Sequence, residues 1–241
     1  MNMIKQEWNN LTDGQDKTAP LAIVFAIVII FIYCYFGSYS FFETAFSYLD
    51  NVDYYKILYH NCMSFILFFG LGGIYVKFVM KKNLKDYGLG LGNRRFGGYF
   101  VLLATIIVPI IILSVLLDNS MKETYPLVDL AQNSMWWQWC AYFASYILYY
   151  IGWEFLFRGI LFFGTKDNFG VLNAILITTL ISCLIHTSIA GFGKPLIETL
   201  SAMFAGLIFG FVASKTNSIY YSIYAHALVG ICTDLYIFFL A

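Results

Sequence analysis

The chain has 241 residues, of which 60% are hydrophobic, 20% are aromatic and only 12% are charged. Soluble domains carry about 45–50% apolar and about 25% charged residues, so this composition excludes a soluble globular protein. The 14 basic and 14 acidic side chains give a formal charge of zero. Neither a basic nucleic-acid-binding face nor a charged solubilising tail is therefore expected.

Seven stretches reach the length of about 20 mostly apolar residues that a membrane-spanning helix needs. They lie near residues 19–41, 55–80, 96–117, 136–165, 171–191, 195–214 and 217–240. An eighth, short helix is possible within the 136–165 stretch or in the 118–135 joint. The sequence thus predicts an all-α, polytopic membrane helical bundle, with residues 1–241 as a single membrane-embedded domain.

Basic residues gather in the joint between the second and third stretches. This joint carries Lys77, Lys81, Lys82, Lys85, Arg94 and Arg95. Because Lys and Arg concentrate in cytoplasmic joints, we expect this joint and the N-terminus to be cytoplasmic. No signal-peptide cleavage pattern follows the first apolar run, so the first helix is expected to be retained.

Six ionisable side chains fall inside the predicted spans rather than at their edges, all within the last four spans. They are Glu154, Arg158, His186, Glu198, His226 and Asp234. A charge at the bilayer centre costs at least ~2.5–3.5 kcal/mol on insertion scales, so such residues usually belong to a functional site. A rise of 1.5 Å per residue puts them about 10 to 25 Å from the cytoplasmic ends of their helices. We expect them to meet in one internal pocket, where each offsets another's desolvation.

Residue spacing supports this convergence. Glu154 and Arg158 are four residues apart and share a helix face, as do His226, Gly230 and Asp234. Small residues allow membrane helices to approach closely, and the sixth span carries one every four residues. This run of Ala202, Gly206 and Gly210 predicts a helix-packing seam.

The segment Trp153-Glu154-Phe155-Leu156-Phe157-Arg158-Gly159, followed by His186 and His226 on later spans, resembles a family of intramembrane proteases. This is the CAAX-prenyl-endopeptidase and bacteriocin-processing family (CPBP, or Abi). Its usual blocks are two adjacent glutamates followed after three residues by arginine, then Phe-x-x-x-His, then His-x-x-x-Asn or Asp. The resemblance covers residues 136–240 as a catalytic-core-like region. It implies a glutamate-dependent endopeptidase whose site opens toward the cytoplasm and the lipid.

Three positions depart from the family pattern. Trp153 stands in place of the first glutamate, the residue that usually activates water in this family. Ser182 replaces the phenylalanine before His186, and Gly230 replaces the Asn or Asp after His226. The compact chain and the resemblance together place the protein in a bacterial cell membrane.

Peptide hydrolysis requires a base that activates water and donors that stabilise the oxyanion. Glu154 is the first candidate base, although the Arg158 guanidinium one turn away would lower its basicity. Glu198 is the second candidate base. His186 and His226 are assigned to oxyanion binding or proton relay. Arg158 is counted with these four as catalytic, and we assign Asp234 and Trp153 to substrate contact.

No cofactor is expected. Two histidines and a glutamate could alternatively bind zinc, but the His-Glu-x-x-His spacing of many zinc proteases is absent. The five cysteines lie singly in apolar runs and suggest neither a disulfide nor a metal site. The expected partners are membrane lipid and a peptide or membrane-protein substrate, without nucleic acid and with the oligomeric state open.

The leading hypothesis is an intramembrane endopeptidase acting on a membrane-borne or amphipathic peptide. The alternative is a catalytically inactive pseudoprotease that binds a peptide or membrane protein as an immunity or scaffold factor. Two further hypotheses are a polar network that only fixes helix registry and a proton-coupled transporter, the latter disfavoured because no half of the chain is repeated. The aromatic run from Tyr146 to Tyr150 is interpreted as an interface anchor with lipid-facing packing.

Overall fold

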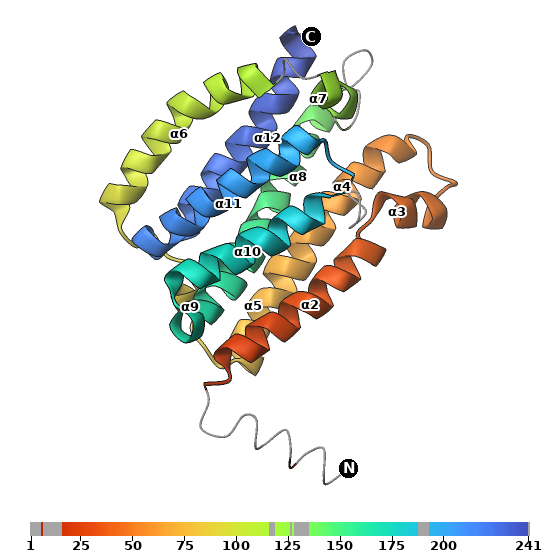
Figure 1. The fold of residues 1–241 in the computed structure, drawn as a ribbon. Coiled ribbons are helices and arrows are strands. Elements are labelled where there is room, and N and C mark those ends of the chain that lie inside the picture. The colour runs from red at the N-terminus through yellow and green to blue at the C-terminus, as the bar shows by residue number, and fades with distance from the viewer. Residues whose placement is uncertain are drawn as a thin grey trace.

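The computed structural model describes residue 6 and residues 16–115, 119–125, 127, 135–187 and 193–240. Within these residues all regular secondary structure is helical and no strand occurs. The prediction of an all-α bundle is confirmed (Figure 1).

Among the described residues, six helices are long and apolar enough to cross a membrane. Four of them are the single elements α2 (Thr18–Phe36), α6 (Arg94–Val115), α11 (Leu196–Thr216) and α12 (Tyr220–Leu240). The second in chain order joins α4 (Val52–Ser64), η1 (Phe65–Leu71), α5 (Gly72–Ile74) and η2 (Tyr75–Val79). The fourth joins α8 (Trp136–Glu154), η4 (Phe155–Phe163) and α9 (Gly164–Phe169). Each coincides with a predicted span, and the protein is a multi-pass integral membrane protein.

The predicted fifth span, residues 171–191, is shorter than the others. It forms α10 (Val171–His186), an apolar helix of 16 residues. At 1.5 Å per residue this helix is about 24 Å long, less than the ~30 Å hydrocarbon core of a bilayer. Residues 188–191 of the prediction lie outside the described residues.

The eighth helix that the sequence left open does not cross the membrane within the described residues. The 136–165 stretch belongs to one continuous helix, Trp136–Phe169, of 34 residues. In the joint before it, α7 (Asn119–Thr124) has six residues, too few to span a bilayer. Residues 118, 126 and 128–134 of that joint lie outside the described part of the chain.

The two ends of the bundle differ in their charge. One end, here called the basic end, carries the short helix η3 (Leu84–Tyr87) and the lysines Lys81, Lys82 and Lys85. The other, here called the opposite end, carries α3 (Tyr39–Ala45), α7 and the start of α8. In Figure 1 the basic end lies near α9 and the start of α2, and the opposite end lies near α7 and the C-terminus.

The helix Trp136–Phe169 is the axis of the bundle. Buried residues make up 78% of its most apolar window, against 17% to 33% in the five other candidate spans. All nine residues of η4 are buried. The outer helices expose large apolar side chains such as Ile27, Leu102 and Phe204, as lipid contact requires. In its η4 segment, the side chains of the central helix are therefore surrounded by protein on all sides.

Glycines allow the closest helix contacts. A side chain on Gly152 of the central helix would lie 2.5 Å from the carbonyl oxygen of Ser64 on α4. On α11, Gly206 packs on Thr179 and Gly210 packs on Ile175, both of α10. The predicted small-residue seam is confirmed, and it joins α11 to α10.

We predict that Gly152→Ala lowers the Tm of the purified protein in detergent, measured by its thermal loss of monodispersity. The added methyl would push α8 away from α4, and overpacking of this kind costs about 1–3 kcal/mol. Gly98→Ala on α6 is the matched control, because nothing lies within 4 Å of a side chain added there. Its Tm should stay equal or rise slightly, since Ala favours helix over Gly. Equal Tm values for the two variants would contradict the close contact.

Candidate functional site

The carboxylate of Glu154 lies at the centre of the predicted site. Its Oε1 accepts a hydrogen bond from Nη1 of Arg158 at 3.1 Å and another from Nδ1 of His226 at 2.7 Å. Glu154 is fully buried, and 2% of Arg158 is exposed. The central helix and α12 therefore meet as the sequence predicted, with Glu154 and His226 in direct contact.

Local helix geometry explains the pair of Glu154 and Arg158. Glu154 ends α8 and Arg158 lies in η4, one turn further on, so their side chains share a face. The Arg158 guanidinium also lies over the Phe209 ring of α11, 5.6 Å from its centroid. A buried ion pair costs much desolvation to form, but removing one partner leaves an unpaired buried charge and costs more. Arg158 therefore compensates the Glu154 charge inside the bundle.

The contact with Glu154 defines the proton positions on His226. An ionised carboxylate only accepts hydrogen bonds, so the Nδ1 of His226 carries the proton. In the neutral ring, Nε2 then has a free lone pair. The Tyr150 ring, 4.3 Å away between centroids, and the Phe209 ring, 5.4 Å away, hold the imidazole in place. About 19% of the His226 side chain is exposed, so His226 is more accessible than Glu154 and Arg158.

His186 lies beside this cluster without a direct bond to Glu154 among the described contacts. Its Nδ1 donates to the carbonyl oxygen of Ser182 at 2.7 Å, which again leaves Nε2 unprotonated in the neutral ring. The ring meets the edge of Trp153 at a centroid distance of 5.5 Å. His186 and His226 are also close enough to interact electrostatically. The structure therefore places both histidines at one site, with the same ring nitrogen bound to an acceptor.

Trp153 is part of the core rather than of an exposed surface. Its relative exposure is 1%, and it stacks on Tyr149 and packs against Phe157 and Phe68. Its indole Nε1 has no hydrogen-bond partner among the described residues. Trp153 thus fixes the position of the central helix against η1 and covers one side of His186.

Glu198 belongs to a second polar cluster at the opposite end of the bundle. Its Oε1 accepts from the Tyr125 hydroxyl at 2.9 Å, and Nζ of Lys194 lies 3.6 Å away. Nζ of Lys194 also donates to the Tyr125 hydroxyl at 2.5 Å. Burial, with the neighbouring Glu198 charge next, raises the pKa of Tyr125 well above its ordinary value, so its phenol stays protonated. Glu198 is linked to His186 only through an electrostatic interaction.

Asp234 lies toward the same end of the bundle as Glu198. It is fully buried, and its Oδ2 accepts from the Tyr142 hydroxyl at 2.6 Å. The Tyr146 hydroxyl lies 3.4 Å from that of Tyr142, and Asp234 also interacts electrostatically with Glu198. The six predicted residues therefore form an inner cluster around Glu154 and an outer cluster around Glu198, rather than one set of mutual contacts.

The interpretation of Tyr146 as lipid-facing is wrong. Tyr142 and Tyr146 are 0% and 3% exposed and point from α8 toward α12. The sequence holds the signal: Tyr142, Tyr146, Tyr150, Glu154 and Arg158 follow one another at intervals of four residues. They therefore share a single helix face. Tyr125 and Lys194 were also missed as partners of Glu198, because both lie in joints that no helical period describes.

Within the part of the chain that the structure describes, no group of three or more His, Cys, Asp or Glu side chains is arranged to hold a metal ion. All five cysteines are free. The expectation that no cofactor is needed remains a prediction.

Comparison with known proteins gives one match. Residues 135–232 match a family model described as Rce1-like: type II CAAX prenyl endopeptidase Rce1-like. The match includes Glu154, Arg158, His186, Glu198 and His226, and it ends before Asp234. No curated protein and no solved structure matches the chain.

We predict strong coupling in a double-mutant cycle on Glu154→Gln and Arg158→Met, read out as Tm in detergent. Each single change leaves a buried group without its partner and should destabilise by about 3–5 kcal/mol. The double variant removes both charges and should lose less than the sum of the two.

A cycle on Asp53→Asn and Lys56→Met is the control for this measurement. Asp53 is 82% exposed and bonds Lys56 at the protein surface. Exposed pairs contribute about 0–1 kcal/mol, so these changes should be small and additive. Additive losses at Glu154 and Arg158 would show that the two charges are not paired in the membrane.

Proposed function

We propose that the protein is an intramembrane endopeptidase, and the premise is the match of residues 135–232 to the family model described as Rce1-like type II CAAX prenyl endopeptidase. It hydrolyses a peptide bond of a membrane-borne or amphipathic peptide. The observation that carries the proposal is the hydrogen bond between Nδ1 of His226 and the buried carboxylate of Glu154.

The geometry supports His226 as the general base, in place of Glu154. Oε1 of Glu154 already accepts two hydrogen bonds, one of them from a guanidinium that favours the ionised carboxylate and lowers its basicity. Glu154 is also fully buried, whereas His226 is partly exposed. An acceptor at Nδ1 holds imidazole in the tautomer whose Nε2 takes a proton, and it stabilises the cation that forms.

The reaction then runs in two proton transfers. Nε2 of His226 takes a proton from water as the water oxygen bonds to the carbonyl carbon of the scissile peptide. The tetrahedral intermediate collapses with cleavage of the carbon–nitrogen bond, and the same Nε2 returns the proton to the leaving amine. Glu154 stays ionised throughout, and Arg158 balances its charge. Glu198 lies in the outer cluster and takes no part in these steps.

We predict that His226→Ala lowers the turnover of quenched fluorogenic peptides by about 10²–10⁴-fold in protein reconstituted into lipid vesicles, the range typical of a lost general base. Glu154→Gln should also lower kcat, because an amide can donate to Nδ1 and stabilise the wrong tautomer. Glu198→Gln is the matched control, a buried-carboxylate change outside the proposed steps, and should retain activity within about tenfold.

Full turnover by His226→Ala would contradict the assignment, as would a loss with Glu198→Gln equal to that with Glu154→Gln. The scheme uses no metal ion, so excess EDTA should leave turnover unchanged. Loss with EDTA and recovery with zinc would instead favour zinc bound by the Nε2 atoms of His186 and His226.

A specific observation favours the second candidate function, a pseudoprotease that binds a peptide or membrane protein without cleaving it. Trp153 occupies the position where the family resemblance places the water-activating glutamate, and its indole is buried in the core. If that glutamate is indispensable, the fold retains binding but not hydrolysis.

Trp153 variants distinguish the two candidates. With His226 as the base, we predict that the parent cleaves peptides and that Trp153→Phe, which keeps an aromatic ring in the core, retains turnover within about tenfold. Trp153→Glu should be inactive or unstable, because it buries a further carboxylate beside Glu154. The measurement is turnover of the same peptides, with monodispersity as the folding control. An inactive parent that gains hydrolysis with Trp153→Glu would establish the pseudoprotease.

We place the protein in a bacterial cell membrane with its N-terminus and basic end in the cytoplasm. The support is the concentration of Lys and Arg in the joint between the second and third spans. Its surroundings are lipid and its partner is the substrate peptide.

A further inference from the structure

We propose that a cavity at the basic end of the bundle binds the headgroup of a zwitterionic phospholipid that carries a phosphate and a primary ammonium, as phosphatidylethanolamine does. The bound headgroup connects the joint before α6 to the end of the central helix. This lipid site is separate from the groups around Glu154 and His226, and it does not depend on the proposed hydrolysis.

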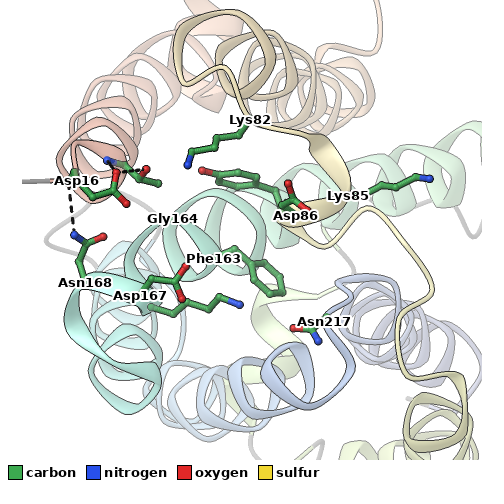
Figure 2. A pocket seen from close by; sticks show the side chains of 12 residues that line it. Asp16, Lys82, Lys85, Asp86, Phe163, Gly164, Asp167, Asn168 and Asn217 are labelled. Atoms are coloured by element: carbon green, nitrogen blue, oxygen red, sulfur yellow. Dashed lines mark hydrogen bonds between the residues drawn. The ribbon is translucent and has the colours of Figure 1, made fainter.

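The cavity has a volume of about 400 Å³ and is lined by segments that are far apart in the sequence (Figure 2). Cavities of about 300–1,000 Å³ are typical of small-ligand sites. Phe163 and Gly164 of the central helix form part of its wall. Phe163 follows Glu154 by nine residues, which is about 13 Å along a helix. The cavity is therefore distinct from the proposed catalytic site.

Each lining segment lies at the end of a membrane span. Thr18 is the first residue of α2, and Lys82 lies just beyond the span Val52–Val79. Asn168 precedes the last residue of the central helix, and Asn217 directly follows α11. The ends of membrane spans lie in the headgroup region of a bilayer. A lipid headgroup can therefore reach the cavity without leaving the layer in which it normally lies.

The cavity carries charges of both signs. Its lining includes three lysines and three aspartates: Lys82, Lys85, Lys166, Asp16, Asp86 and Asp167. Within the part of the chain that the structure describes, none of these six side chains forms an ion pair. In Figure 2, Lys82 from the joint and Asp167 from α9 extend toward the space between them.

This balance of charge indicates the class of headgroup. Basic pockets beside membrane spans bind the phosphates of lipid headgroups. Here an anionic headgroup without an ammonium would bring a further negative charge close to the aspartates, which costs electrostatic energy. A headgroup with both a phosphate and an ammonium pairs with the lysines and the aspartates at the same time.

A buried hydroxyl belongs to the same lining. Tyr87 is only 3% exposed, and its hydroxyl has no hydrogen-bond partner among the described residues. Burial, with the charges of Asp16, Asp86 and Asp167 next, raises the pKa of Tyr87 to about 12, so the phenol keeps its proton. Buried polar groups normally have a partner. The Tyr87 hydroxyl is therefore a donor available to a phosphate oxygen.

The aromatic rings of the cavity favour a primary over a quaternary ammonium. Proteins hold quaternary ammonium groups against the faces of aromatic rings. The Lys166 ammonium already lies over the Phe163 ring, 4.7 Å from its centroid, and Tyr87 packs in the apolar core. A primary ammonium instead donates charge-assisted hydrogen bonds to carboxylates, which are among the strongest in proteins. The lining thus fits an ethanolamine headgroup better than a choline headgroup.

A headgroup bound here would strengthen a weak connection between α2 and α9. Nδ2 of Asn168 donates to the carbonyl oxygen of Asp16 at 3.5 Å, which is longer than the usual range of about 2.7–3.2 Å. A phosphate on Lys82 and an ammonium on Asp167 would add a bridge from the joint to α9. Because a ligand that binds only the folded state stabilises it, the lipid should also raise the Tm.

The lipid preference can be measured by native mass spectrometry of the full-length protein. The protein is released from micelles that contain equimolar phosphatidylethanolamine, phosphatidylcholine and phosphatidylglycerol with identical acyl chains, so that a preference reports on the headgroup alone. We expect the one-to-one adduct with phosphatidylethanolamine to be about tenfold more abundant than either other adduct, a factor that one charge-assisted hydrogen bond can supply.

Variants of the lining separate the two charges. Lys82→Gln should lower the phosphatidylethanolamine adduct about tenfold, because the phosphate loses a cation. Lys81→Gln is the matched control, since it removes the same charge from the neighbouring residue, which does not line the cavity; it should change the adduct by less than about twofold. Asp167→Asn should abolish the preference over phosphatidylcholine and increase the phosphatidylglycerol adduct. Tyr87→Phe, which keeps the ring in the core, should also lower the phosphatidylethanolamine adduct.

Free phosphoethanolamine distinguishes a lipid from a soluble ligand with the same charged groups. We expect it to displace the lipid only above about a hundredfold molar excess, because acyl chains hold the lipid at the level of the cavity. Displacement at equimolar concentration would show that the ligand is soluble and would overturn the lipid site.

Two further results would overturn the site. One is an equal abundance of the three lipid adducts, and the other is an equal loss with Lys81→Gln and Lys82→Gln. Monodispersity of each variant shows that it is folded before its adducts are compared. None of these measurements requires hydrolysis, so the lipid site and the proposed endopeptidase are tested independently.

Discussion

The pairing of one fully buried carboxylate determines how this bundle is built. Glu154 can stay ionised away from water only if donors surround it, and the two that bond it come from one turn along its own helix and from α12. The positive charge of Arg158 cancels the negative charge of the Glu154 carboxylate. The bond to His226 then fixes which face of α12 is turned toward the central helix, and with it the position of Gly230 and Asp234.

The central helix makes this arrangement possible because it is the most buried of the long helices that the structure describes. Its first half, α8, presents tyrosine hydroxyls and the Glu154 carboxylate on a single face, whereas its second half, η4, presents only apolar groups apart from Arg158. The helix is π-helical from Phe155 to Phe163, immediately after Glu154. Such segments are rare and often lie at functional sites, where they redirect side chains. The change from a polar to an apolar environment therefore coincides with the change in helix type.

The spans and the inner cluster could be predicted from the sequence because both depend on local periodicity. Helix length follows from runs of apolar residues, and the pairing of Glu154 with Arg158 follows from their spacing. The depth estimated from the helical rise puts Glu154 and His226 at a similar level in the bilayer, and the structure places them in contact. Depth does not give the direction in which a helix face points. For this reason the sequence alone assigns the run from Tyr146 to Tyr150 to lipid and places Glu198 in the same pocket as Glu154. The partners Tyr125 and Lys194 lie in joints whose positions depend on tertiary contacts.

Trp153 and the assignment of His226 as the base are consistent with one another. A second carboxylate beside Glu154 would need a second buried cation, and among the described residues packed on Trp153 only the His186 ring is basic, the others being aromatic or apolar. An indole at this position adds core packing between the central helix, η1 and α2, and it lies nearly perpendicular to the His186 ring. With His226 as the proposed base, hydrolysis would depend on an imidazole whose orientation one carboxylate controls, so a single glutamate in the motif would be chemically sufficient. Under this proposal, tryptophan in place of the first glutamate assigns the proton to His226, an imidazole that Glu154 of the central helix already holds in position.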